Sequence, residues 1–138
     1  MSESKKPANY DAGKAMRSKV LGADYVSRSV SNPDDFAAPL QDVVTSHAWG
    51  TVWTREGLPP KLRSLATVSM LIALNRPNEL KLHMRGALNN GITPDELREL
   101  IIHASVYCGF PAAMDSMKHA KALFEELGLM GSDGVMKD

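Results

Sequence analysis

Apolar positions recur every three to four residues through most of the chain, which is the period of helices that bury one face. The clearest example follows Pro59 and Pro60, in the stretch "KLRSLATVSMLIAL". No segment alternates apolar and polar residues between turn signals, as a half-buried strand would. The pattern therefore predicts an all-α fold.

Prolines and glycines punctuate this pattern where helices are expected to begin and end. Pro77 precedes "NELKLHMRGALNN", and Gly91 follows it as a C-terminal glycine. The segment "TPDE" at residues 93–96 has the pattern of a capping box with proline at the first helical position. Together these signals predict helices over residues 10–21, 24–31, 39–50, 61–74, 78–90, 94–109 and 111–127, with the upstream ones less clearly marked.

A chain of 138 residues suits one domain with a sizeable core. Neither an internal repeat nor a linker divides it, so we expect a single helical domain over residues 1–138 with about six helices joined by short turns. We expect residues 1–9 and 129–138 to be flexible tails. The N-terminal segment lacks the apolar core of a secretory signal.

Charge and hydropathy exclude several functions. Lysine plus arginine and aspartate plus glutamate number 16 each, so the formal net charge gives no basis for binding nucleic acid or an anionic membrane. The longest apolar run, "LATVSMLIAL", is too short to cross a bilayer as a helix. These features predict a cytoplasmic protein, and an uncharged small domain with a wide apolar face favours self-association.

Glu79 and His83 are the most distinctive polar pair. On a helical wheel His83 lies about 40° from Glu79, next to apolar or small residues such as Leu80 and Ala87, while charges such as Lys81 occupy another arc. We therefore expect the pair to face away from solvent, which disfavours an ordinary surface pair. A buried structural pair and a functional pair remain equally open. A carboxylate that orients an imidazole leaves the other ring nitrogen to move a proton.

Two aromatic side chains and a histidine lie upstream. His47 shares a stripe with Leu40 and Val43, so it is either a core histidine, which is slightly favoured, or part of a pocket wall. Trp49 and Trp53 are expected in the core or in an interface, with a pocket wall as the alternative.

The remaining candidates lie further along the chain. Arg63, in an otherwise apolar helix, is either a surface residue with a buried stem or an anion clamp facing a cavity. Cys108 lies on an apolar stripe and is expected to be a buried, inert thiol. As the only cysteine, it excludes a disulfide framework or a site of several thiolates. His103 is expected on the surface, and His119 gives no functional signal.

The ordered series "AWG…VWTR.GL…RSL…IAL.R..EL.LH.R.AL.NG.T..E" and "YCG.PAA" resembles the carboxymuconolactone decarboxylase family from His47 to Ala113. The resemblance implies the all-α fold of alkyl hydroperoxidase D-like proteins and a ring-shaped homohexamer. It also implies decarboxylation of a small lactone carboxylate, gamma-carboxymuconolactone, to beta-ketoadipate enol-lactone in protocatechuate catabolism. No cofactor or metal is expected.

The thiol peroxidase branch of the same superfamily carries two cysteines and a histidine on one helix. Aligned on His83, those cysteine positions fall on Arg76 and Glu79, and a glutamate of that branch falls near Ser64. A dithiol cycle needs two thiols within exchange range, which Cys108 alone does not supply. The peroxidase reading is therefore the weaker alternative, beside a related lyase or isomerase on another lactone or enolisable acid.

The resemblance supports His83 as proton donor and Glu79 as the residue that orients it. Inference from the residues alone adds Arg63 or Arg76 as the contact for a substrate carboxylate. Trp49 and His47 are further candidates for lining the pocket.

Overall fold

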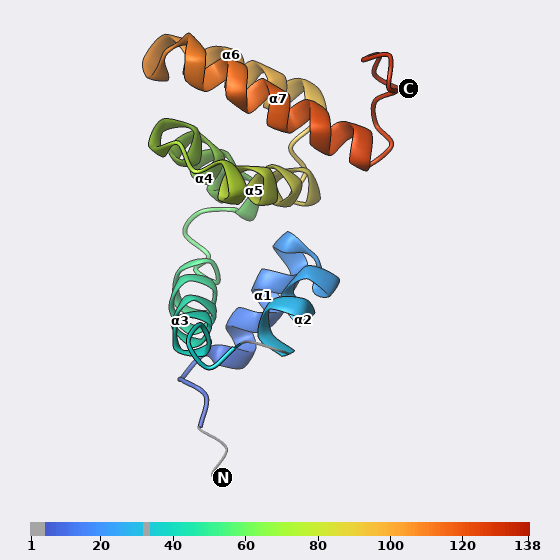
Figure 1. Ribbon diagram of the computed structural model, residues 1–138. Helices are drawn as coiled ribbons and strands as arrows, with labels where there is room; N and C mark the ends of the chain where they lie inside the picture. Colours follow the sequence, from blue (N-terminus) through green and yellow to red (C-terminus); the bar gives the residue numbers. More distant parts are fainter. Residues whose placement is uncertain (1–4, 32–33) are drawn as a thin grey trace. The chain divides into compact units, whose positions relative to one another are not determined.

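The computed structural model describes residues 5–31 and 34–138, and these form seven α-helices and one π-helix without a regular strand (Figure 1). The predicted all-α fold is thereby confirmed. In chain order the elements are α1 (Tyr10–Leu21), α2 (Ala23–Ser31), α3 (Ala38–Val43), the π-helix η1 (Val44–Val52), α4 (Pro60–Leu74), α5 (Pro77–Asn89), α6 (Pro94–Cys108) and α7 (Phe110–Glu126). No helix within the described ranges has both the length and the apolar character to cross a membrane.

The chain divides into two compact units, Met1–Pro60 and Lys61–Asp138. We call them the N-terminal and C-terminal units and describe each by itself. The expectation of one domain over residues 1–138 stays a prediction.

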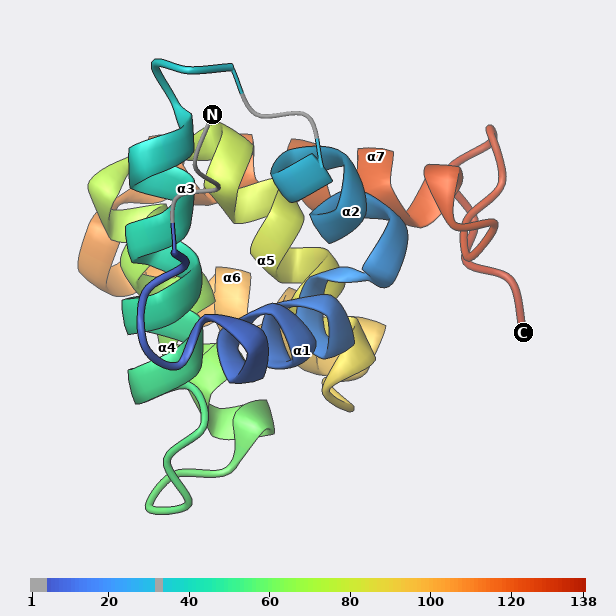
Figure 2. The ribbon, with the colours of Figure 1, turned by 90° about the horizontal axis from the view of Figure 1, so that it is seen from below.

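In the N-terminal unit, α1 packs against both α2 and η1 (Figure 2). Two glycines permit the close approach of α1 to η1. A Cβ atom on Gly13 would overlap the backbone carbonyl of Thr45, and one on Gly50 would overlap the carbonyl of Asn9. Any side chain at either glycine would push the two helices apart.

The helix predicted over residues 39–50 differs from the structure. It is α-helical only to Val43 and continues as η1, in which, for example, the Trp53 N–H donates to the carbonyl of Ala48, five residues before it, at 2.9 Å. A π-helix holds more residues per turn than an α-helix, so an apolar stripe counted with the α-helical period does not continue through it. Nothing in the local sequence signals this change.

The C-terminal unit consists of two helical hairpins, α4–α5 and α6–α7, whose ends match the predicted punctuation (Figure 1). The capping box is confirmed, because the Thr93 hydroxyl accepts from the Glu96 N–H at 3.0 Å and the Glu96 carboxylate accepts from the Thr93 N–H at 3.0 Å. Gly91 turns the chain at φ 95°, in the left-handed region that favours glycine.

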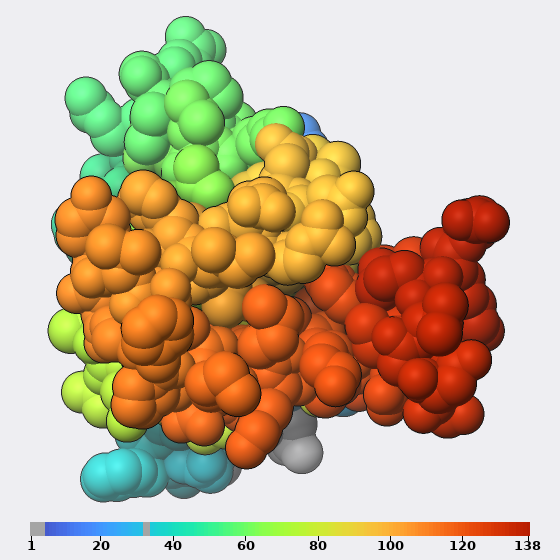
Figure 3. All heavy atoms as spheres, turned by 90° about the horizontal axis from the view of Figure 1, so that it is seen from above, coloured from blue at the N-terminus to red at the C-terminus, as the bar shows by residue number. Residues whose placement is uncertain are grey.

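The chain after α7 forms a hydrogen-bonded turn, and the expectation of a flexible tail over residues 129–138 stays a prediction. The Gly131 N–H donates to Val135 and the Lys137 N–H to Leu129, both at 2.9 Å, which closes a turn. Figure 3 shows this segment, in red, beside α6 and α7. At the other terminus, residues 1–4 lie outside the described residues, and Lys6 forms a 2.8 Å ion pair with Asp42.

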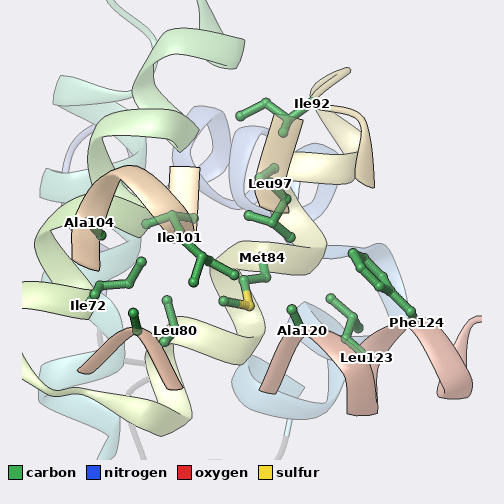
Figure 4. Close-up of a cluster of buried hydrophobic side chains, with 13 residues drawn as sticks. Ile72, Leu80, Met84, Ile92, Leu97, Ile101, Ala104, Ala120, Leu123 and Phe124 are labelled. Atoms are coloured by element: carbon green, nitrogen blue, oxygen red, sulfur yellow. The ribbon is translucent and has the colours of Figure 1, made fainter. Parts of the chain in front are cut away.

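The core of the C-terminal unit takes side chains from all four of its helices (Figure 4). Met84 of α5 lies near its centre and is fully buried, as are Leu97 and Ile101 of α6 and Leu123 of α7. Burial of each such side chain contributes about 1.5–3 kcal/mol. The core fixes which face of α5 turns inward, and so it positions the candidate site on that helix.

Candidate active site

Helix α5 carries three of the predicted site residues, Arg76 at its N-cap position and Glu79 and His83 in its first two turns. Pro77 lies in the first turn of the helix, where the backbone N–H that proline lacks would form no intrahelical hydrogen bond. The Arg76 carbonyl accepts the N–H of Leu80 at 2.8 Å, which is the first hydrogen bond of the helix. The local sequence therefore places these three side chains at successive turns of one short helix.

The two members of the central pair differ in burial. His83 is half-buried and its Nδ1 atom is shielded from solvent, whereas Glu79 is exposed. The prediction that both face away from solvent is wrong for Glu79. The core face of α5 is centred on Leu80, Met84 and Ala87, so His83 lies at its edge and Glu79 lies beyond it.

The basic side of α5 also differs from the prediction. Lys81 and Arg85, which the wheel assigned to solvent, are half-buried, and both pair with Glu126 at the end of α7, at 3.7 Å and 2.6 Å. Long basic side chains cover apolar surface with their stems while their heads stay in water. Helix α7 therefore packs near an arc that sequence reasoning had left to solvent.

Proton transfer is the chemistry that fits this helix. A half-buried imidazole both accepts and donates protons near neutral pH. In general, a carboxylate one turn before an imidazole on a helix can hold one ring nitrogen and stabilise the protonated ring. In this chain Glu79 stays in water, where such a contact is weak.

Helix α4 supplies Arg63, which is half-buried. Its backbone carbonyl accepts the Thr67 hydroxyl at 2.8 Å. The neighbouring Ser64 is fully buried, and its hydroxyl accepts the Asn90 amide at 2.8 Å, which ties α4 to the end of α5. Arg63 and α5 thus belong to one unit, and the role of its guanidinium stays a prediction.

His47 and Trp49 belong to the N-terminal unit. His47 is exposed, so its interpretation as a core histidine is wrong, because the whole stripe that it shares with Leu40 and Val43 lies outside the core, with those two side chains 70% and 57% exposed. Trp49 is buried and stacks on Trp53 with ring centroids 4.7 Å apart and planes 23° apart. The core interpretation of Trp49 is confirmed, and a role for either residue in a substrate pocket stays a prediction.

Cys108 ends α6 and is half-buried against the core of the C-terminal unit. Its burial is less complete than the apolar stripe predicted. His103 is exposed, as expected, and contacts the ring of Tyr107.

Sequence reasoning missed two polar features. His119 lines a cavity of about 350 Å³ with Arg76, and the polar pair Ser116 and His119, three residues apart on α7, could have indicated it. Arg17 is 5% exposed and donates hydrogen bonds to Gln41 and Thr45. No pattern in the sequence around Arg17 indicates this burial or these partners.

The fold is all-α, and it places Glu79 and His83 one helical turn apart on one helix of a four-helix unit. Residues 38–122 match the model of the carboxymuconolactone decarboxylase family, and the chain belongs to that family. The match runs across the boundary between the two units.

Two relatives extend the comparison. The chain is 46% identical over 129 residues to 4-carboxymuconolactone decarboxylase of Acinetobacter baylyi, covering 94% of this chain and 96% of that protein. It is also 46% identical over 108 residues to the nitrosuccinic acid decarboxylase of Metarhizium robertsii, covering 78% of this chain and 76% of that protein. The two relatives are named for one reaction type on different acids.

Proposed function

We propose that the protein is a carboxy-lyase that converts 4-carboxymuconolactone (gamma-carboxymuconolactone) to beta-ketoadipate enol-lactone in protocatechuate catabolism. The observation that carries the proposal is the 46% identity to the Acinetobacter baylyi enzyme over 94% of the chain. The half-buried His83 on α5 supports it, because the reaction needs a proton donor near an enclosed site.

The chemistry requires little beyond the substrate itself. The carbon–carbon bond to the departing carboxylate breaks, CO₂ leaves, and the electron pair stays on the ring. The ring double bond and the lactone carbonyl delocalise that pair, so the substrate acts as its own electron sink and no cofactor is expected. A proton added to the ring then completes the balance. The protein must therefore stabilise enolate charge and deliver one proton to one carbon.

In this proposal His83 donates that proton. Glu79, one helical turn earlier, orients the imidazole and stabilises its protonated form. Because Glu79 is exposed in the single chain, its contact with His83 gains strength when substrate or a second chain excludes water from that face.

Both acids named for the relatives are dicarboxylic acids with an electron-withdrawing group, a lactone carbonyl in one and a nitro group in the other. Loss of one carboxylate leaves a second that the protein must hold. Arginine is permanently charged and binds a carboxylate with two parallel hydrogen bonds, so Arg63 or Arg76 serves this contact. The assignment of His47 and Trp49 to the wall of a substrate pocket stays a prediction from the sequence.

The test is conversion of purified 4-carboxymuconolactone, followed by the loss of its ultraviolet absorbance and by the release of CO₂. Nitrosuccinate, assayed in parallel, separates the proposal from its alternative, a related lyase on another acid. Faster turnover of the lactone supports the proposal. Turnover of nitrosuccinate without turnover of the lactone would show that the proposed substrate is wrong and that the protein is still a decarboxylase. Peroxide reduction abolished by Cys108→Ser would favour the peroxidase alternative.

Self-association in the cytoplasm is part of the same proposal. Four large apolar side chains around the junction of α6 and α7 are 62–77% exposed, namely Val106, Tyr107, Phe110 and Met114. Figure 3 shows the face formed by these two helices. Contiguous apolar surface of this kind is typical of protein interfaces, and a ring-shaped homohexamer would cover it.

A further inference from the structure

A cavity of about 350 Å³ lies within the C-terminal unit, between the α4–α5 turn and the first half of α7. Its apolar wall comes from Leu71, Ile72 and Leu80, and its polar groups include Arg76, Lys118 and His119. The volume falls in the range of pockets that enclose small organic molecules. Glu79 and His83 are not among its lining residues, so the cavity is distinct from the proposed acid–base pair.

The charge of the lining is unbalanced. Arg76 and Lys118 contribute two positive charges and Asp115 one negative charge, which leaves a net charge of +1 with His119 neutral. Within residues 5–31 and 34–138, neither Arg76 nor Lys118 forms an ion pair, in contrast to Lys81 and Arg85 of α5.

Ser116 and His119 are two further polar residues in the lining of the cavity. The Ser116 hydroxyl is buried and donates to the carbonyl of Ala112 at 2.8 Å, so it is already engaged. His119 is half-buried and lines the cavity, where its imidazole supplies a ring N–H donor. The lining of the cavity therefore combines cationic donors with apolar side chains.

We propose that this cavity binds a small organic carboxylate, with its charged group on Arg76 and Lys118 and its apolar body on Leu71, Ile72 and Leu80. A guanidinium binds a carboxylate in a bidentate manner, and the ammonium of Lys118 adds a second charge from the neighbouring helix. An uncharged molecule of the same shape gains only the apolar contact.

Two sources of this carboxylate share the same chemistry. One is the carboxylate that the proposed substrate retains after CO₂ leaves, since Arg76 is only one turn before Glu79 on α5. The other is a separate carboxylate molecule that binds without reacting. The first source rests on the proposed function, whereas the second does not.

The experiment titrates the full chain with benzoate, an unreactive carboxylate with an apolar body, by calorimetry and by amide chemical shifts. Benzyl alcohol is the uncharged control. We expect saturable benzoate binding with shifts at the α4–α5 turn and in the first half of α7. Lys118→Met weakens binding about three- to fivefold, the size of one partly exposed charge contact. Lys121→Met, which removes an equal exposed charge one turn further along α7, leaves binding unchanged.

Steady-state kinetics of Lys118→Met with the lactone separates the two sources. A raised KM at constant kcat identifies the retained carboxylate of the substrate, and unchanged kinetics with weakened benzoate binding identifies a separate ligand. The proposal is overturned if benzoate does not bind saturably, if benzyl alcohol binds equally well, or if Lys121→Met weakens binding as much as Lys118→Met. Benzoate binding is also measured with His83→Gln, which lacks the proposed proton donor. Binding equal to that of the wild type would show that the cavity binds a carboxylate independently of the proposed function.

Discussion

Arg17 of α1 donates from Nη1 to the Thr45 hydroxyl of η1 at 3.1 Å, and the same nitrogen donates to the Gln41 side chain of α3 at 2.9 Å. Thr45 is fully buried and Arg17 nearly so. Within the described residues no carboxylate forms an ion pair with this guanidinium. A buried cation held by neutral acceptors therefore joins α1 to α3 and to η1, the element that carries His47 and Trp49.

Arg17→Ala removes both hydrogen bonds and leaves the Thr45 hydroxyl buried without this donor. We expect the free energy of unfolding in urea to fall by about 1–3 kcal/mol. Arg28→Ala, at an exposed position on α2, is the matched control and changes it by less than about 0.5 kcal/mol. Equal effects of the two substitutions would show that the buried hydrogen bonds of Arg17 contribute nothing.

Gly13→Ala tests the close contact between α1 and η1. The added methyl group overlaps the Thr45 carbonyl, so the helices must separate, at a cost of about 1–3 kcal/mol in the free energy of unfolding. Gly57→Ala is the control, because a Cβ there meets no atom within 4 Å and restricts only the unfolded chain. A Gly13→Ala variant as stable as Gly57→Ala would contradict the packing described for this unit.

The lowered pKa of the Glu96 carboxyl predicts that the stability of the protein depends on pH. The hydrogen bond from the Thr93 backbone, and then the contact with Lys61, lower the pKa of Glu96 from its ordinary value. A lowered pKa in the folded state adds stability above the unfolded-state pKa, and this stability is lost as the pH falls through the folded-state pKa. Glu96→Gln should therefore lose less stability than the wild type between pH 7 and about pH 3.

Urea unfolding at the two pH values measures the effect, with Glu125→Gln as an exposed control on α7. An equal loss of stability on acidification in the wild type and in Glu96→Gln would contradict a stabilising role for the Glu96 carboxylate.

The exposed apolar side chains at the α6–α7 junction predict self-association. Tyr107→Glu combined with Phe110→Glu places two charges in a contact that excludes water, so the assembly should dissociate to smaller species. Light scattering after size-exclusion chromatography measures the mass. Ala122→Glu, exposed on α7, is the control and should leave the mass unchanged. A wild-type protein that is monomeric at all concentrations would contradict the proposed homohexamer.

Local signals predicted the helices of the C-terminal unit well. Pro77 and Pro94 begin α5 and α6, and the Thr93–Glu96 capping box forms as the spacing indicated. These features depend on the backbone within one or two turns, so a single sequence contains the information.

Features set by tertiary contacts could not be predicted in the same way. The wheel placed Lys81 on an arc away from Glu79, and the pairing of Lys81 with Glu126 of α7 is decided by packing between the helices. The stripe of Leu40, Val43 and His47 is exposed although its apolar pattern favoured burial, because packing decides which face of a segment turns inward. The cavity beside His119 depends on how α7 meets the α4–α5 turn.

The most direct test of the central claim is the rate of 4-carboxymuconolactone decarboxylation by His83→Gln. Loss of a general acid predicts a fall in kcat of about 10²- to 10⁴-fold with the helical circular dichroism unchanged. Glu79→Gln should show a smaller fall, and His103→Gln, at an exposed position on α6, should keep full activity. Undiminished decarboxylation by a folded His83→Gln variant would contradict the assignment of His83 as proton donor.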